Sequence, residues 1–221
     1  MRNKAVVLLS GGLDSATVLY IAKKTGYQCR CLIFDYGQRH RREIESAKNI
    51  AQAAGCAYQI LKINLPWKGS ALLDKNIPVP ELKNSRTQEL KNKIPTTYVP
   101  ARNIIFLSFA LSFAETIKAQ AIFIGAHAQD YSGYPDCRPE FFAAFSRMAK
   151  AGTFGRFNIL APLLRKNKSR IILLGKKLKV PFNLTWSCYR GEKQPCGKCD
   201  SCYYRAKGFK QAGIVDPLIK C

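Results

Sequence analysis

The chain has 221 residues, and its 36 Lys and Arg against 14 Asp and Glu give a formal net charge of +22. A chain of this length can bury about 70% of its unfolded surface, so one domain, or one domain with an appendage, can build a sizeable core. No apolar run reaches the ~18 residues of a membrane span, and a strand stands where a signal peptide would have its apolar region. We therefore expect a cytoplasmic protein.

The positive charge is spread along the chain, with local clusters at residues 39–42, 83–93 and 165–179. Such a field attracts anions and allows non-specific electrostatic binding of nucleic acid. Because the basic residues are dispersed, we favour an anionic small substrate or a generally basic proteome over a dedicated nucleic-acid site.

The N-terminal segment predicts a strand, a tight loop and a helix. Residues 5–9 are an apolar run, Gly11 and Gly12 interrupt it, and helical periodicity begins at Ser15. The start of such a helix directs free N–H groups and the positive end of its dipole into the loop, and glycines let an anion approach closely. The loop therefore predicts a phosphate site.

Residues 10–15 read Ser-Gly-Gly-Leu-Asp-Ser, without the Gly-Lys-Ser/Thr ending of the Walker loop or the three glycines of the dinucleotide fold. This string resembles the pyrophosphate loop of the N-type ATP pyrophosphatases, which cleave ATP between the α and β phosphates to adenylylate an acceptor. The alternative is a plain βα turn. The resemblance implies that Ser10, Gly11, Gly12 and Ser15 hold the pyrophosphate, and that Asp14 helps with Mg²⁺ or fixes the loop. The residues assigned to ATP are Leu8, Leu9, Ser10, Gly11, Gly12, Leu13, Asp14, Ser15, Ala16, Thr17 and Val18.

Strands and helices alternate in the next part of the chain. We expect a strand at residues 29–34, a helix at 43–54 and a strand at 58–65. This alternation is typical of a parallel sheet with right-handed crossovers, in which ligands bind at the carboxyl ends of the strands. Asp35 lies at such an end. The predicted fold class is α/β, with a parallel, doubly wound sheet.

The periodicity fails at residues 66–100, which contain five prolines. We predict a long excursion there, which can be a lid, a subunit contact or an insertion without a specific role. A helix at 104–118 and a strand at 121–125 follow. Arg102, near the start of that helix, can hold a phosphate or a carboxylate bidentately beside a nucleotide site, although an Arg in this position is often only solvated.

The loop at residues 125–141 combines aromatic rings, carboxylates, an arginine and a thiol, which suits a pocket for a flat, hydrogen-bonding ligand. The role of His127 stays open between ligand contact and structural support. A strand at 158–163 and a basic helix at 167–178 complete the predicted elements of the sheet.

The C-terminal region carries Cys188, Cys196, Cys199 and Cys202 with the spacing C-x₇-C-x₂-C-x₂-C. Thiolates at this spacing can converge on one tetrahedral ion, and four of them make a closed, structural Zn²⁺ site. A disulfide pair and an iron–sulfur cluster are the alternatives. The total of nine cysteines is odd and favours a metal in a reducing compartment. We expect a nucleotide-binding domain at 1–184 and a helical, zinc-binding appendage at 185–221.

Together these motifs resemble one family, the 7-cyano-7-deazaguanine synthases of queuosine precursor biosynthesis. The matching stretches are residues 8–18, 35–40, 98–103, 130–141, 185–189, 196–202, 205, 208–209 and 216–217. The resemblance implies a ligase that uses ATP to convert 7-carboxy-7-deazaguanine and ammonia to the nitrile, through an adenylylated carboxylate and an amide. It further implies Mg²⁺, a structural Zn²⁺ and compatibility with a homodimer. The expected catalytic residues are Asp14 and Arg102, and the expected substrate contacts are Asp130, Tyr131, Asp136, Arg138 and Glu140.

Two other functions remain open from the sequence. A pyrophosphate-loop sulfurtransferase acting on tRNA would suit the charge, but it needs redox-active or cluster-binding cysteines. A nonenzymatic zinc-ribbon protein that binds nucleic acid would leave residues 10–15 unexplained. The metal held by the late cysteines separates the first alternative from the ligase, and nucleotide binding without nucleic acid excludes the second.

Overall fold

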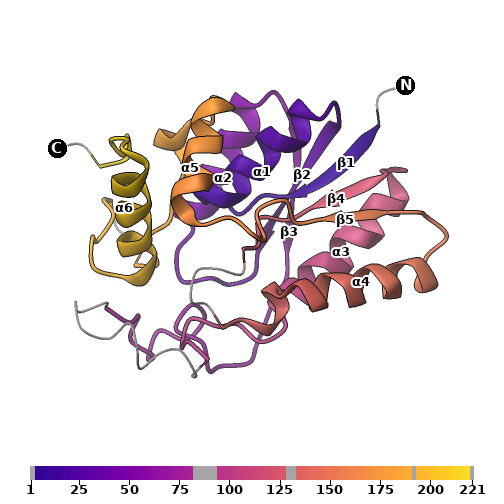
Figure 1. Cartoon of the computed structure of the whole chain (residues 1–221). Helices are drawn as coiled ribbons and strands as arrows, with labels where there is room; N and C mark the ends of the chain where they lie inside the picture. The colour runs from indigo at the N-terminus through magenta and orange to yellow at the C-terminus, as the bar shows by residue number, and fades with distance from the viewer. Residues whose placement is uncertain (1–2, 82–93, 128–132, 191–192, 220–221) are drawn as a thin grey trace.

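A parallel five-stranded sheet with the order β3-β2-β1-β4-β5 forms the centre of the fold (Figure 1). The computed structural model describes residues 3–81, 94–127, 133–190 and 193–219. Its strands are β1 Lys4–Leu8, β2 Gln28–Asp35, β3 Ala57–Lys62, β4 Ala121–Phe123 and β5 Asn158–Leu160. Every neighbouring pair runs parallel, which confirms the predicted α/β class.

Helices cover both faces of the sheet because the side chains of each strand alternate between two apolar clusters. In β1, Ala5 and Val7 belong to one cluster, whereas Val6 and Leu8 belong to the other. The first cluster is covered by α1 Leu13–Lys24, α2 Arg42–Ala53 and α5 Lys168–Lys177, and the second by α3 Arg102–Thr116 and α4 Pro139–Gly152. Figure 1 shows these two layers, with α6 Asp200–Ala212 beside α5.

The strand order reverses direction at β1, which pairs with β2 on one side and β4 on the other. In a doubly wound sheet, the loops on either side of such a point separate and leave a crevice at the carboxyl ends of the strands. The loop after β1 and the loop after β4 meet here. A Cβ on Gly125 would lie 2.9 Å from the backbone nitrogen of Ser15, so only glycine allows this approach.

The predicted elements are present with shifted ends, and one helix is missing from the prediction. The strands β3, β4 and β5 end two or three residues before their predicted ends. Helix α4 occupies Pro139–Gly152, where the sequence analysis placed the end of a loop and assigned no helix. Its signals were present: Pro at the first helical position, Glu140 in the first turn, and Phe142, Phe145 and Ala149 buried at helical spacing.

The excursion at residues 66–100 has no regular helix or strand in its described parts, 66–81 and 94–100, apart from an isolated bridge between Glu81 and Cys199. These parts are nevertheless packed: Ala71 and Leu72 are buried, and the Ala71 N–H donates to the Thr96 carbonyl at 2.8 Å. In Figure 1 they lie below the carboxyl ends of the strands. The described parts of the excursion therefore form a floor beneath the crevice.

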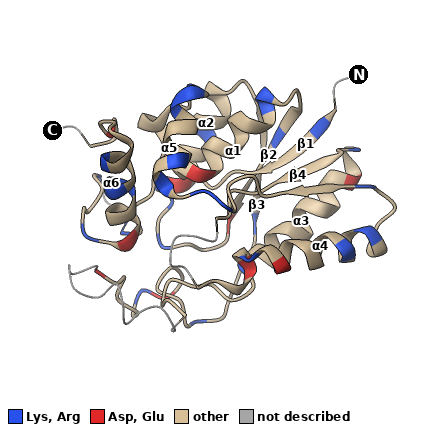
Figure 2. Cartoon of the chain, viewed as in Figure 1, with Lys and Arg blue, Asp and Glu red and all other residues tan. Residues whose placement is uncertain are grey.

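Lys and Arg residues occur on helices of both layers and on several strands (Figure 2). The dispersal expected from the sequence is therefore also a dispersal in space. Among the residues that the structure describes, none of the helices combines the length and apolar character that a membrane span requires.

Candidate active site and metal centre

A cavity of about 540 Å³ opens at the carboxyl edge of the sheet, within the size range of small-molecule sites. Of the predicted ATP-binding residues, those on its wall are Leu8, Leu9, Ser10, Gly12, Leu13, Asp14 and Ser15, whereas Gly11, Ala16, Thr17 and Val18 are not. We call the part around residues 10–15 the loop end. The opposite part, around Arg102, is the aromatic end, formed by Tyr36, Phe106, Tyr134 and Tyr189.

The two loop glycines have different roles. Gly11 has φ +83°, and a Cβ there would lie 2.2 Å from the Glu43 carbonyl oxygen, so this glycine lets the loop pack against the start of α2. Gly12 has an ordinary φ, and a Cβ on it would come no closer than 3.5 Å to a neighbour, the Ser10 hydroxyl. Gly12 faces the cavity. Gly11 thus supports the loop, and Gly12 leaves room for a ligand.

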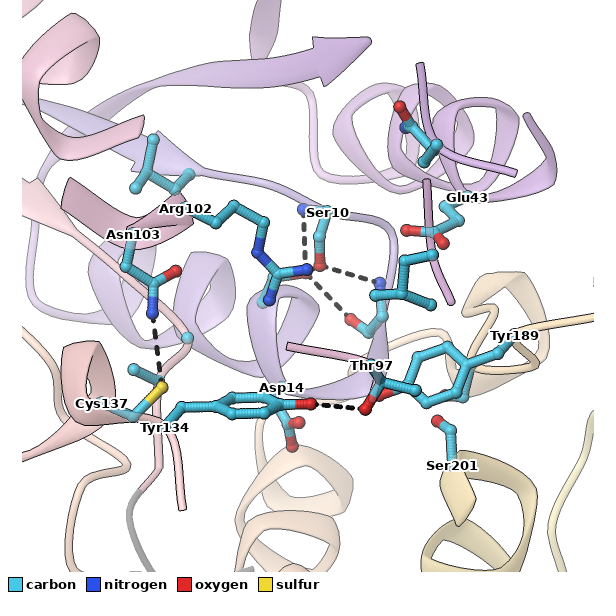
Figure 3. Close-up of a pocket in the computed structure, with 18 of the residues that line it drawn as sticks. Ser10, Asp14, Glu43, Thr97, Arg102, Asn103, Tyr134, Cys137, Tyr189 and Ser201 are labelled. Atoms are coloured by element: carbon cyan, nitrogen blue, oxygen red, sulfur yellow. Dashed lines mark hydrogen bonds between the residues drawn. The ribbon is translucent and has the colours of Figure 1, made fainter. Parts of the chain in front are cut away.

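Ser15 ties the loop together. Its hydroxyl donates to the Gly12 carbonyl at 3.0 Å and accepts from the Ser10 N–H at 3.2 Å. The Ser10 hydroxyl donates to the Ser15 hydroxyl oxygen at 3.0 Å (Figure 3). These bonds hold the loop open at the N-terminus of α1, where free N–H groups and the helix dipole favour an anion.

Asp14 lies in a compact charge cluster at the loop end. Lys168 Nζ donates to both carboxylate oxygens of Asp14, at 3.0 and 2.8 Å, and His127 Nε2 lies 3.2 Å from Oδ2. Burial alone would raise the pKa of Asp14, but Lys168 and then His127 outweigh it and hold that pKa well below its usual range. Asp14 is therefore ionised. This ion pair joins the start of α1 to the start of α5.

The sequence analysis missed Lys168, which it counted only within a basic cluster. Lys168 is the first residue of α5, and the Asn167 side chain caps that helix by accepting from the Arg170 N–H at 2.9 Å. A Cβ on Gly208 of α6 would lie 2.4 Å from Lys168 Cγ. The cap and this small residue place the ammonium group at the loop end. His127, whose role was left open, belongs to the same cluster.

Arg102 extends from the start of α3 into the aromatic end (Figure 3). Its Nη1 lies 3.5 Å from the Tyr36 hydroxyl, and Tyr134 and Tyr189 are further neighbours that stabilise the cation. Burial lowers the pKa of Arg102, and the three tyrosines more than reverse this effect, so it stays charged. The result is a partly buried cation among tyrosine side chains, suited to an anionic group on a flat ligand.

Glu43 also lines the cavity, and the sequence analysis gave it no role. Burial raises its pKa to about 7, although Arg102 acts in the opposite direction. A carboxyl group with this pKa can exchange a proton near neutral pH. The only sequence signal was its place at the start of a helix that follows a strand end, which is too common to identify a site.

The predicted substrate residues are distributed differently from the prediction. Asp136 is buried outside the cavity, and its Oδ2 accepts from the Asn103 N–H at 2.9 Å, so it caps the first turn of α3 and fixes the helix that carries Arg102. Arg138 and Glu140 are exposed at the start of α4 and do not line the cavity. Asp130 and Tyr131 lie outside the described residues. From the same stretch, Tyr134 and Cys137 reach the wall.

The four late cysteines converge. The sulfurs of Cys188, Cys196, Cys199 and Cys202 all lie within 4.8 Å of one another. A single Zn²⁺ with Zn–S bonds of about 2.3 Å would place tetrahedral sulfurs about 3.8 Å apart, so this set fits one ion after a small contraction. A multi-iron cluster would hold its thiolates farther apart, because metal–metal spacing adds to the bonds. N–H groups of residues 190, 196 and 199 donate to the sulfurs, as a thiolate site requires.

The cysteine region is attached to the cavity and not separate from it. The Trp186 N–H donates to the Gly11 carbonyl at 2.9 Å, and the indole Nε1 donates to the Cys188 carbonyl at 3.0 Å. Arg205 forms a two-point ion pair with Asp216 and donates to Thr185 at 2.8 Å. Tyr189, Asp200 and Ser201 consequently stand on the cavity wall. A metal at the cysteines would hold this wall in place.

Comparisons with known proteins indicate one protein family. A family model described as "Queuosine biosynthesis protein QueC" matches residues 4–213. A 7-cyano-7-deazaguanine synthase from Nostoc sp. (strain PCC 7120) is 52% identical over 222 residues, with 97% of this chain and 96% of that protein covered.

Solved structures show the same fold at lower identity. The structure of NMN synthetase from Francisella tularensis has a TM-score of 0.52 and 19% identity, covering 97% of this chain and 79% of that one. A U34-tRNA thiolase from Methanococcus maripaludis, with an iron–sulfur cluster, has a TM-score of 0.51 and 17% identity, covering 96% and 68%. These likenesses concern the fold alone. The family match and the near full-length relative show that this chain belongs to the QueC family of queuosine biosynthesis proteins.

Proposed function

We propose that the protein is an ATP-dependent 7-cyano-7-deazaguanine synthase, which converts 7-carboxy-7-deazaguanine and ammonia to the nitrile. The observation that carries this proposal is one cavity that joins a phosphate-type loop to a partly buried arginine among aromatic residues. A nucleotide that carries phosphates and a flat base that carries a carboxylate need these two environments side by side. The curated relatives that share half of the sequence have this name.

The loop end binds the β and γ phosphates of ATP in this proposal. Ser10, Gly12 and Ser15 supply hydroxyl and backbone N–H donors at the N-terminus of α1. Lys168 adds a positive charge that Asp14 orients. Mg²⁺ would offset the charge of the phosphates; it favours phosphate oxygens and water as ligands, so it need not displace Lys168 from Asp14.

The aromatic end binds the deazaguanine base and directs its carboxylate toward the α phosphate. Arg102 pairs with the carboxylate or with the phosphate that it attacks, both of which match its planar guanidinium group. Tyr134 and Tyr189 offer flat faces and hydroxyl groups to the base. The Thr97 hydroxyl, 2.7 Å from that of Tyr134, fixes this ring in place (Figure 3).

The chemistry follows from the poor reactivity of a free carboxylate toward an amine. The substrate carboxylate attacks the α phosphorus, pyrophosphate leaves, and ammonia then displaces AMP to form the amide. Glu43, with a pKa of about 7, takes the proton that the attacking ammonia must lose. A second ATP activates the amide oxygen with release of pyrophosphate, and the departure of that oxygen in AMP, with loss of both N–H protons, leaves the nitrile.

No cysteine nucleophile is needed in this sequence of steps. Burial raises the pKa of Cys137, the thiol on the cavity wall, to about 11, so it is protonated at neutral pH. The C-terminal cysteines hold a structural zinc in a closed set of four ligands, with no open position for a substrate. This separates the proposal from a tRNA sulfurtransferase, which requires reactive or cluster-bound cysteines.

The proposal is tested by incubating the protein with ATP, Mg²⁺, ammonium and 7-carboxy-7-deazaguanine, and following the base and the nucleotides by chromatography and mass spectrometry. We expect 7-cyano-7-deazaguanine, AMP and pyrophosphate, and no turnover of 7-deazaguanine that lacks the carboxylate. Transfer of sulfur to tRNA in place of nitrile formation, with an iron chromophore in the purified protein, would support the sulfurtransferase instead.

A further inference from the structure

Three further thiols lie at the opposite edge of the sheet from the cavity. Cys29 and Cys31 are buried residues of β2, and Cys56 comes directly before β3. All three are free, and all three belong to or pack against the apolar cluster under α1, α2 and α5. Neither the proposed reaction nor the metal centre uses them.

The strand register places Cys29 beside Cys56. Strands β2 and β3 pair in parallel with Arg30 opposite Ala57, and one step back along both chains brings Cys29 opposite Cys56. Neighbouring strands lie about 4.8 Å apart, and disulfides form between residues whose Cα atoms are about 4.4–6.8 Å apart. Because both side chains face the same cluster, the register places the two sulfurs beside each other on one face of the sheet.

Cys31 is the second neighbour of Cys56, two residues along β2 on the same face. Cys29 and Cys31 are 6% and 0% exposed, whereas Cys56 is partly exposed, so a reagent from solvent reaches Cys56 first. Among the described residues, it is the four C-terminal cysteines that converge as metal ligands, and these three do not. The geometry therefore points to redox chemistry and not to a second metal site.

Two buried thiols and a nearby cation surround Cys56. The Cys56 thiol donates to the Ala54 carbonyl at 3.5 Å, and the Lys23 ammonium group donates to the same carbonyl, which places a positive charge near the sulfur. Hydrogen bonds from the Cys29 and Cys31 thiols, followed by the charge of Lys23, hold the pKa of Cys56 well below its ordinary value. The two buried thiols show the opposite shift, because their bonds to Cys56 and their burial raise the pKa of each.

We propose that Cys56 is a peroxide-reactive thiol and that Cys29 is its resolving partner, so that oxidation closes a Cys29–Cys56 disulfide within the folded protein. The Cys56 thiolate attacks one oxygen of hydrogen peroxide, the O–O bond breaks, and the departing hydroxide takes a proton to become water. The Cys29 sulfur then attacks the sulfur of the Cys56 sulfenic acid and releases a second water. Two thiols and one peroxide thus give one disulfide and two waters, and a dithiol reductant reverses the change.

Peptide mapping tests this directly, because trypsin separates the three thiols. Cleavage at Lys and Arg leaves Cys29 in residues 25–30, Cys31 in 31–39 and Cys56 in 49–62. The native, zinc-loaded protein is treated with hydrogen peroxide, blocked with an alkylating agent and digested without reduction. We expect a cross-link between peptides 25–30 and 49–62, about 2 Da lighter than the two reduced peptides, which a dithiol removes.

Three variants serve as controls. Cys56→Ser should abolish the cross-link, Cys31→Ser should leave it unchanged, and Cys29→Ser should move it to peptide 31–39 at a lower rate. Circular dichroism and zinc content show that each variant is folded. The proposal is overturned if Cys56 is only overoxidised without a cross-link, if the cross-link forms only in denaturant, or if all three thiols resist peroxide while unfolded protein reacts.

Discussion

The two ends of the cavity are built in opposite ways. The loop end comes mainly from consecutive residues, 10–15, and its hydrogen bonds join Ser10, Gly12 and Ser15 within a single turn. The aromatic end combines residues from the loop after β2, from α3, from the stretch before α4 and from the cysteine region. A short motif can therefore announce the loop end, whereas the aromatic end exists only after the sheet, the excursion and the cysteine region have assembled. We expect substitutions at the two ends to separate nucleotide binding from base binding.

The largest effect is expected for Gly12→Val at the loop end. Because Gly12 faces the cavity with no close neighbour, the side chain should fill the place of the phosphates and abolish ATP binding, as measured by calorimetry, while the protein stays folded and keeps its metal. Gly11→Ala is the matched control, because a Cβ there strikes the Glu43 carbonyl and should lower thermal stability. Wild-type ATP affinity in the Gly12 variant would show that the nucleotide does not bind at this loop.

Loss of the metal should sharpen the comparison by damaging mainly the aromatic end. We expect about one zinc per chain in the purified protein, and Cys199→Ser should lower metal content and melting temperature together. Tyr189 and Ser201 flank metal ligands, so binding of the base should weaken more than binding of ATP. Cys29→Ser, outside the metal set, should keep its zinc. Full zinc content in the Cys199 variant would contradict the four-ligand assignment.

Arg102→Met should leave ATP binding at the loop end largely intact and lower kcat/KM for the carboxylated base by about 10³, the scale of losing a charged donor to a transition state. Arg138→Met is the matched test of the sequence-based assignment. Because Arg138 is exposed and off the cavity wall, its loss should change kcat/KM by less than about threefold. A comparable loss in both variants would return Arg138 to the substrate site.

A smaller effect, about 10²-fold on kcat, is expected for Glu43→Gln. With a pKa of about 7, the wild-type carboxyl gains a proton as pH falls, so kcat should decline below that pH, and the variant should lack this decline. The free energy of unfolding should depend on pH in the opposite sense. Because the pKa of Glu43 in the folded protein lies above its ordinary value of 4.5, the wild-type protein loses stability as pH rises from about 4.5 to about 7. The variant, which cannot ionise, should be more stable at pH 8 by about 1–3 kcal/mol. Identical pH profiles of kcat in the wild-type protein and the variant would show that Glu43 does not transfer the proton.

Local signals explain how much of the molecule could be predicted. The glycine loop, the alternating strands and the cysteine spacing are patterns of residues that are close in the sequence. The observed sheet and cysteine cluster confirm the strands and the convergence of the cysteines. Helix α4 was missed because its first turn continues a run of polar and turn-forming residues. Pro139 is typical of a loop as well as of the first position of a helix, so the sequence alone did not distinguish the two.

Tertiary contacts explain the rest. Lys168 is 154 residues from Asp14 in the sequence, and the packing of α5 against α1 brings the two together. Asp136 has the composition of a ligand contact, but its position against the first turn of α3 makes it a cap for Asn103. An aspartate can either contact a ligand or cap a helix. The role of Asp136 depends on Asn103, which lies 33 residues away in the sequence.

The most direct test of the account is the fate of the carboxylate oxygen. With ¹⁸O in the carboxylate of 7-carboxy-7-deazaguanine, attack on the α phosphorus followed by displacement with ammonia should leave the label in AMP, detected by mass spectrometry. Label in orthophosphate, with ADP as the nucleotide product, would show attack on the γ phosphorus and an acyl phosphate. That result would contradict the adenylylation for which the loop end is proposed.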